Sequence, residues 1–105
     1  MRKLTIAFDI DGTLRCNCTE TCRDVNDNVV AIAKALDGSL KNARLIAWSG
    51  GGAKYAAQFV RDNPALYNIF GERCYSKLAA PAVDLAFDDQ HEFGLGTVNL
   101  IVRAK

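Results

Sequence analysis

The sequence lacks a charge excess of either sign. Its 105 residues include 13 Lys and Arg against 12 Asp and Glu, so the formal net charge is +1 at pH 7. Proteins that bind nucleic acids or anionic membranes through their overall charge carry a strongly basic field. The composition therefore indicates neither a nucleic-acid partner nor a membrane partner.

The sequence also lacks a long apolar run. The apolar stretch that starts at Leu4 stops at Asp9, which makes it too short for a membrane span or a signal peptide. We expect a soluble, cytoplasmic protein, in which cysteines are reduced thiols or metal ligands rather than disulfides. The sequence shows no internal repeat, low-complexity segment or interdomain linker, and its length suits a single domain over residues 1–105.

Apolar patterns predict that strands and helices alternate. Leu4–Asp9 is a short apolar run ended by a turn signal, which is typical of a strand buried in a parallel sheet. Four further strands are expected at residues 43–48, 73–76, 83–87 and 97–102. Helices are expected at residues 25–36 and 53–60, with a turn or short helix at 65–70. This alternation predicts a small, three-layer, Rossmann-like α/β domain with a mostly parallel five-stranded sheet.

The ends of the first predicted helix carry their own signals. Asp24 or Asn26 is expected to be its N-cap, because both residue types cap helices well. Gly38 is expected to stop it, because glycine favours the residue that follows a helix.

Polar residues follow four of the predicted strands, namely Asp9 and Asp11, Ser49, Lys77, and Asp88 and Asp89. The carboxyl ends of parallel strands lie along one edge of a sheet, so these side chains should converge there. A calcium-binding loop that starts at Asp9 is excluded, because Leu14 occupies the sixth position, where such a loop needs glycine. A simple polar turn could explain Asp9–Gly12 or Asp88-Asp89 taken singly, and Lys77 could be a surface lysine, but these explanations do not account for polar residues at several strand ends.

The motif Asp9-Ile10-Asp11-Gly12-Thr13, followed in order by Ser49, Lys77 and Asp88-Asp89, resembles the four motifs of the haloacid dehalogenase-like hydrolase superfamily. The resemblance covers the length of the chain. It implies a Mg²⁺-dependent phosphatase, a phosphoric monoester hydrolase, in which Asp9 is the nucleophile and forms an aspartyl-phosphate. It also implies that Asp11 is the general acid and base.

The resemblance further assigns the remaining residues of the site. Mg²⁺ would be held by Asp9, the main-chain carbonyl of Asp11, Asp88 and Asp89. The phosphoryl group of the substrate would contact Ser49, Lys77 and the amides of Gly50 and Gly51, while Gly12 lets the chain turn beside the metal.

Several alternatives stay open. Ser49 could cap the following helix, Arg73 could take the role of Lys77, and His91 could touch the leaving group or be a plain surface residue. The family commonly carries a cap domain, for which the spans between the predicted strands are too short. We therefore expect a capless member that takes a small or macromolecular phosphorylated substrate, with self-association into a homo-oligomer as a possible substitute for the cap. The alternative function is an inactive domain that binds a phosphorylated ligand or a protein partner.

A polar loop at residues 14–24 holds three cysteines, Cys16, Cys18 and Cys22. Together with Cys74 or His91 they could bind a structural Zn²⁺. Free thiols are the simpler expectation, and a disulfide between two of them would make the loop redox-sensitive.

Overall fold

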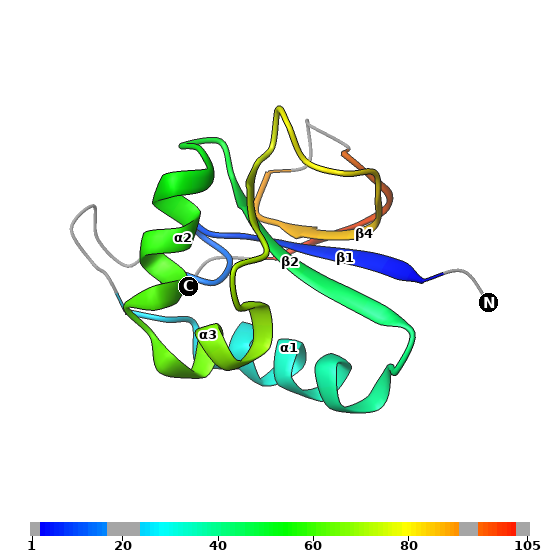
Figure 1. The fold of residues 1–105 in the computed structure, drawn as a ribbon, viewed down its shortest axis with the longest axis horizontal. Helices are drawn as coiled ribbons and strands as arrows, with labels where there is room; N and C mark the ends of the chain where they lie inside the picture. The colour runs from blue at the N-terminus through cyan, green and yellow to red at the C-terminus, as the bar shows by residue number, and fades with distance from the viewer. Residues whose placement is uncertain (1–2, 17–23, 91–94, 103–105) are drawn as a thin grey trace.

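The computed structural model describes residues 3–16, 24–90 and 95–102. Its five strands are β1 (Leu4–Asp9), β2 (Ala43–Ser49), β3 (Cys74–Ser76), β4 (Val83–Asp88) and β5 (Gly96–Ile101). Its three helices are α1 (Asp27–Ser39), α2 (Ala53–Arg61) and α3 (Pro64–Phe70) (Figure 1).

The strands form one parallel sheet in the order β3-β2-β1-β4-β5. The first strand of the chain is therefore the central one. Its register sets Asp9 beside Trp48 of β2 and Phe8 beside Phe87 of β4. The predicted fold class is confirmed: the chain is a small, Rossmann-like α/β domain, and its described residues contain no second folded unit that could act as a cap.

The main core lies between the sheet and the three helices, which gather on one side of it in Figure 1. Alternate residues of β1 point into this core, because side chains alternate across a strand. Phe8 is fully buried there, stacked on Phe87 with ring centroids 4.5 Å apart and edge-on to Phe70 at 5.6 Å. Helix α2 contributes Phe59, which is also buried. Such aromatic contacts add about 1 kcal/mol each beyond the area that they bury.

The other side of the sheet has a smaller core, made of Ala7, Ile46, Trp48, Val83 and Ala86. No residue of the described helices belongs to it. A side chain of the connection between β3 and β4, Ala80, packs against it instead. Among the described residues, no helix covers this side of the sheet, and residues 77–82 between β3 and β4 are too few for a crossover helix.

The ends of α1 match the prediction in part. The helix starts at Asp27, and its N-cap is Asn26, one of the two predicted residues, although the Asn26 side chain makes no capping hydrogen bond. Gly38 does not stop this helix, which continues to Ser39 with Leu40 as the C-cap. A glycine near a helix end costs only about 1 kcal/mol, which the packing of Val29 and Ala33 offsets.

No helix in the described part of the chain is long and apolar enough to cross a membrane.

Candidate active site

The predicted site residues meet at the carboxyl edge of the sheet. Asp9 is the last residue of β1, Asp88 the last of β4 and Ser49 the last of β2. Lys77 directly follows β3, and its amide donates to the carbonyl oxygen of Ser49 at 3.1 Å. Because β1 lies between β2 and β4, the strand order itself brings the two aspartates together.

Lys77 joins the two buried carboxylates. Its Nζ lies 2.9 Å from Asp9 Oδ1 and 2.6 Å from Asp88 Oδ2. All three side chains are almost withdrawn from water, with exposed fractions of 11%, 7% and 9% for Lys77, Asp9 and Asp88. The amide of Gln90 donates to the other oxygen of Asp88 at 3.0 Å and holds that carboxylate in place.

Burial and crowding of like charges dominate the electrostatics. Burial, together with the charge of Asp88, raises the pKa of Asp9 to about 7, although the hydrogen bond from Lys77 acts in the other direction. Burial, together with a hydrogen bond to Asp88, also raises the pKa of Asp89. Burial would lower the pKa of Lys77, but its hydrogen bonds to Asp88 and Asp9 outweigh this effect and the pKa is raised. The lysine therefore stays charged, while the carboxylates share more negative charge than it can neutralise.

This imbalance fits a divalent cation. Asp9, Asp88 and Asp89 each offer a carboxylate oxygen, and these oxygens lie within 4.8 Å of one another. Three carboxylates against one lysine leave a net charge of −2 when all are ionised. Carboxylate oxygens are the ligands that Mg²⁺ prefers in proteins, so the donor set suits this ion.

Gly12 is required by the close approach of Asp89. A Cβ atom at position 12 would lie 2.3 Å from Asp89 Oδ2, and the φ angle of Gly12 is +80°. Both facts make any larger residue unfavourable at this position. Gly12 thus allows the loop after β1 to pass directly beside the third carboxylate of the cluster.

The side chain of Asp11 lies outside the carboxylate cluster and is half exposed. Its Oδ1 accepts hydrogen bonds from Arg15 Nε at 2.8 Å and from the Tyr55 hydroxyl at 2.5 Å. Neither partner was predicted. Arg15 lies four residues after Asp11, and Tyr55 lies at the third position of α2. The contact between Tyr55 and Asp11 depends on how α2 packs, which the sequence pattern does not specify.

Ser49 belongs to a tight turn rather than to a helix cap. Its hydroxyl accepts a hydrogen bond from the amide of Gly51 at 2.9 Å, and its side chain is buried. The N-cap of α2 is Gly52, so the expectation that Ser49 caps this helix is wrong. Because the hydroxyl accepts in this bond, its O–H can still donate a hydrogen bond to another group. The turn leads into the first residues of α2.

Arg73 does not compete with Lys77 for the aspartates. Its guanidinium donates to the carbonyl oxygens of Leu45 at 2.9 Å and Ile69 at 2.6 Å, so it joins α3 to the sheet.

The cysteine predictions remain predictions. Cys16 is half-buried and unpaired. The Cys74 thiol faces the carbonyl oxygen of Gly71 at 3.8 Å, and burial raises its pKa, which disfavours the thiolate. Cys18, Cys22 and His91 lie outside the described residues.

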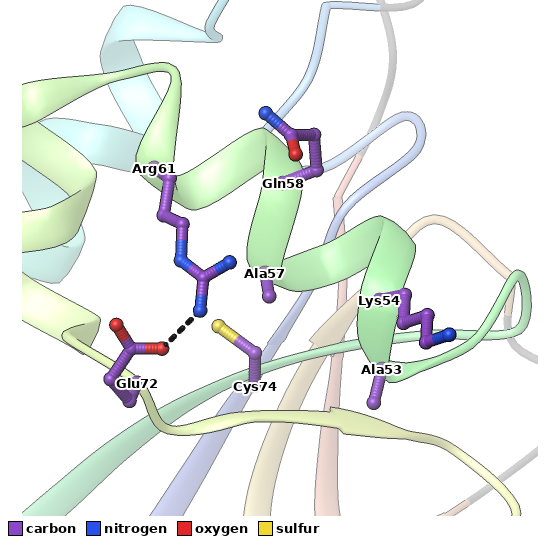
Figure 2. Close-up of a pocket in the computed structure, with 7 residues that line it drawn as sticks. All are labelled: Ala53, Lys54, Ala57, Gln58, Arg61, Glu72 and Cys74. Atoms are coloured by element: carbon purple, nitrogen blue, oxygen red, sulfur yellow. Dashed lines mark hydrogen bonds and ion pairs between the residues drawn. The ribbon is translucent and has the colours of Figure 1, made fainter.

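A groove of about 460 Å³ runs between α2 and β3, lined by Ala53, Lys54, Ala57, Gln58, Arg61, Glu72 and Cys74 (Figure 2). The one ion pair drawn in Figure 2 joins Arg61 to Glu72 at 2.8 Å. Both side chains are more than half exposed, so water screens this pair. The groove contains none of the buried carboxylates that define the cluster at the strand ends.

Comparisons of the chain with protein-family models, with curated proteins and with solved structures find no match.

Proposed function

We propose that the protein is a Mg²⁺-dependent phosphatase in which Asp9 forms an aspartyl-phosphate. The observation that carries this proposal is the buried cluster of Asp9, Asp88, Asp89 and Lys77 at the carboxyl edge of the sheet. Such a cluster is costly to maintain, because burying charges that are incompletely paired destabilises a protein. Strongly shifted pKa values in a group of this kind are typical of functional sites.

In the first step, a carboxylate oxygen of Asp9 attacks the phosphorus of a phosphate monoester. The bond between phosphorus and the ester oxygen breaks, and that oxygen leaves with a proton from the carboxyl group of Asp11. Lys77 stabilises the negative charge on the transferred group from its position beside Asp9. The Ser49 hydroxyl, in the turn at the end of β2, donates a hydrogen bond to a phosphoryl oxygen.

In the second step, water attacks the phosphorus of the aspartyl-phosphate and gives its proton to Asp11, now a carboxylate. The bond between phosphorus and the Asp9 oxygen breaks, which releases inorganic phosphate and restores the carboxylate of Asp9. Asp11 thus acts as acid first and as base second, so each turnover returns it to its starting state.

The residues that would hold Mg²⁺ are Asp9, Asp88 and Asp89, with the main-chain carbonyl of Asp11. When bound, the ion would offset the negative charges of the carboxylates and of the phosphoryl group, which would otherwise repel each other.

The test is hydrolysis of p-nitrophenyl phosphate by the purified protein with Mg²⁺ and with a chelator, beside Asp9→Asn. We expect activity that needs Mg²⁺ and is lost in the variant. Wild-type protein that hydrolyses none of several phosphate esters would contradict the proposal and favour a domain that binds a phosphorylated ligand without turnover. Activity that survives Asp9→Asn would contradict the choice of nucleophile.

A further inference from the structure

We propose that Tyr55, together with Arg15, is a positioning residue that holds Asp11 for proton transfer; this inference rests on the proposed phosphatase function. Tyr55 comes from α2 and Arg15 from the loop after β1, so the two hydrogen bonds reach Asp11 from different elements. Neither residue touches the transferred phosphoryl group in this account, and both act through Asp11.

The need for positioning follows from the exposure of Asp11. Its side chain is 53% exposed and comes from a loop, so packing alone does not select one rotamer. A general acid must be within hydrogen-bond reach of the leaving oxygen at the moment when the bond to phosphorus breaks. Two donors on one carboxylate oxygen fix the carboxyl group in direction as well as in place.

The loop itself brings Arg15 back to Asp11. The amide of Arg15 donates to the carbonyl oxygen of Ile10 at 2.8 Å, and the amide of Gly12 donates to the carbonyl oxygen of Arg15 at 3.1 Å. These backbone hydrogen bonds close a tight loop around Asp11, and the arginine side chain is mostly buried within it.

Tyr55 also contacts the other half of the site. A Cβ atom at Gly51 would lie 3.3 Å from Cδ2 of the Tyr55 ring, so the ring lies against the turn that Ser49 holds. The tyrosine therefore touches the phosphate-binding turn with its ring and the acid–base residue with its hydroxyl. A change in either contact would shift the distance between the phosphoryl group and its proton donor.

Both donors use Oδ1 of Asp11. We therefore assign proton transfer to Oδ2, which gives its proton to the leaving oxygen in the first step and receives one from water in the second.

The test exploits the leaving group. A p-nitrophenolate leaves readily without a proton, whereas an alkoxide needs one, so a misplaced acid harms the hydrolysis of alkyl phosphates more. We expect Tyr55→Phe to lower kcat/KM about tenfold or more for an alkyl phosphate such as glycerol phosphate, and less than about threefold for p-nitrophenyl phosphate. The ratio kcat/KM is used because it reports the first irreversible step and is not limited by release of phosphate.

Two controls separate positioning from a structural effect. Tyr67→Phe removes the same hydroxyl from α3, where it donates to Glu72 on the surface, and should change neither kcat/KM value. Asp11→Asn should show the same preference for the aryl ester as Tyr55→Phe, but more strongly. In the double variant, Tyr55→Phe should cause no further loss, because the acid that it positions is gone.

Equal losses on both substrates, or full additivity in the double variant, would overturn the inference while leaving the phosphatase intact. The inference would also be overturned if Tyr55→Phe left kcat/KM for the alkyl phosphate unchanged while Asp11→Asn lowered it. Failure of the proposed function is seen separately, as a wild-type protein that hydrolyses neither ester.

Discussion

Two ion-pair clusters of the molecule differ in burial and therefore in what they can do. Lys77 lies between Asp9 and Asp88 within the sheet edge, where all three side chains are at most 11% exposed. Arg61 and Glu72 form an equally short pair across the groove between α2 and β3, but both are more than half exposed. An ion pair pays little desolvation free energy at the surface and much more when its charges are buried.

One carboxyl group from each cluster, Glu72 and Asp9, shows this difference in the direction of its pKa shift. The hydrogen bond from Arg61, aided by one from Tyr67, lowers the pKa of Glu72, as expected for a carboxylate with a cation beside it. Burial raises the pKa of Asp9 to about 7 in spite of the lysine. The buried cluster is therefore short of positive charge, whereas the exposed pair is satisfied. This shortage of positive charge is why we propose that the buried cluster holds a cation and an anionic substrate.

The largest expected effect comes from removing the buried cation. Lys77→Met should reduce phosphatase activity by at least about 100-fold, because a charge that stabilises the transferred group is lost. Measured by urea unfolding at pH 8 in chelator, it should also lower the free energy of unfolding by about 4 kcal/mol, because two buried carboxylates lose their partner.

Arg61→Met is the matched control for this variant. It removes a cation from the exposed pair, so the urea midpoint and the activity should both stay at the wild-type values. Equal destabilisation by the two variants would mean that burial is not what separates the clusters.

The second effect concerns pH. The pKa of Asp9 is about 7 in the folded protein against 3.8 as the ordinary value, so between these values the folded state holds a proton that the unfolded state has lost. The free energy of unfolding in chelator should therefore fall as pH rises through this window, by about 2 kcal/mol between pH 5 and pH 7 for this group. Urea unfolding of Asp9→Asn should show a pH dependence that is smaller by that amount. An identical slope in the variant would contradict the raised pKa.

The smallest expected effect tests whether Asp89, the third carboxylate of the cluster, is a Mg²⁺ ligand. Gly12→Ala places a Cβ atom against Asp89 and puts alanine at a φ of +80°, so it should cost about 2 kcal/mol and weaken the rise in melting temperature caused by Mg²⁺. Gly38→Ala changes a glycine in α1 whose Cβ would have open space within 4 Å beyond its own stretch of helix, and should instead stabilise the protein by about 0.5 kcal/mol. A Mg²⁺ response that is unchanged in Gly12→Ala would argue against Asp89 as a ligand.

The part of the site that sequence could predict is the part that topology determines. Apolar runs located the strands, and a parallel sheet places their ends at one edge, so the meeting of Asp9 and Asp88 followed without knowledge of any side-chain contact. The sequence predicted the place of Lys77 less clearly, because β3 has three residues and a weak apolar pattern. Its position depends on the hydrogen bond between its amide and Ser49, which the pattern does not contain.

The part that sequence could not predict depends on how elements pack. The contact of Tyr55 with Asp11 follows from the rotation of α2 over the sheet, and the role of Arg73 follows from two carbonyl groups that happen to lie within reach. Ser49 has the right residue type for a helix cap, but Gly52 occupies that position because the turn takes three glycines before the helix starts. Local propensity describes what a residue can do, and packing selects among these options.

The most direct measurement is to trap the covalent intermediate. The protein is mixed with Mg²⁺ and a phosphate ester labelled on phosphorus, quenched in acid within the first turnover, and digested for mass spectrometry. We expect a phosphoryl group on the peptide that contains Asp9, removed by hydroxylamine as expected for an acyl phosphate and missing in Asp9→Asn. Turnover of the ester with no label on the protein, or with the label on another residue, would contradict it.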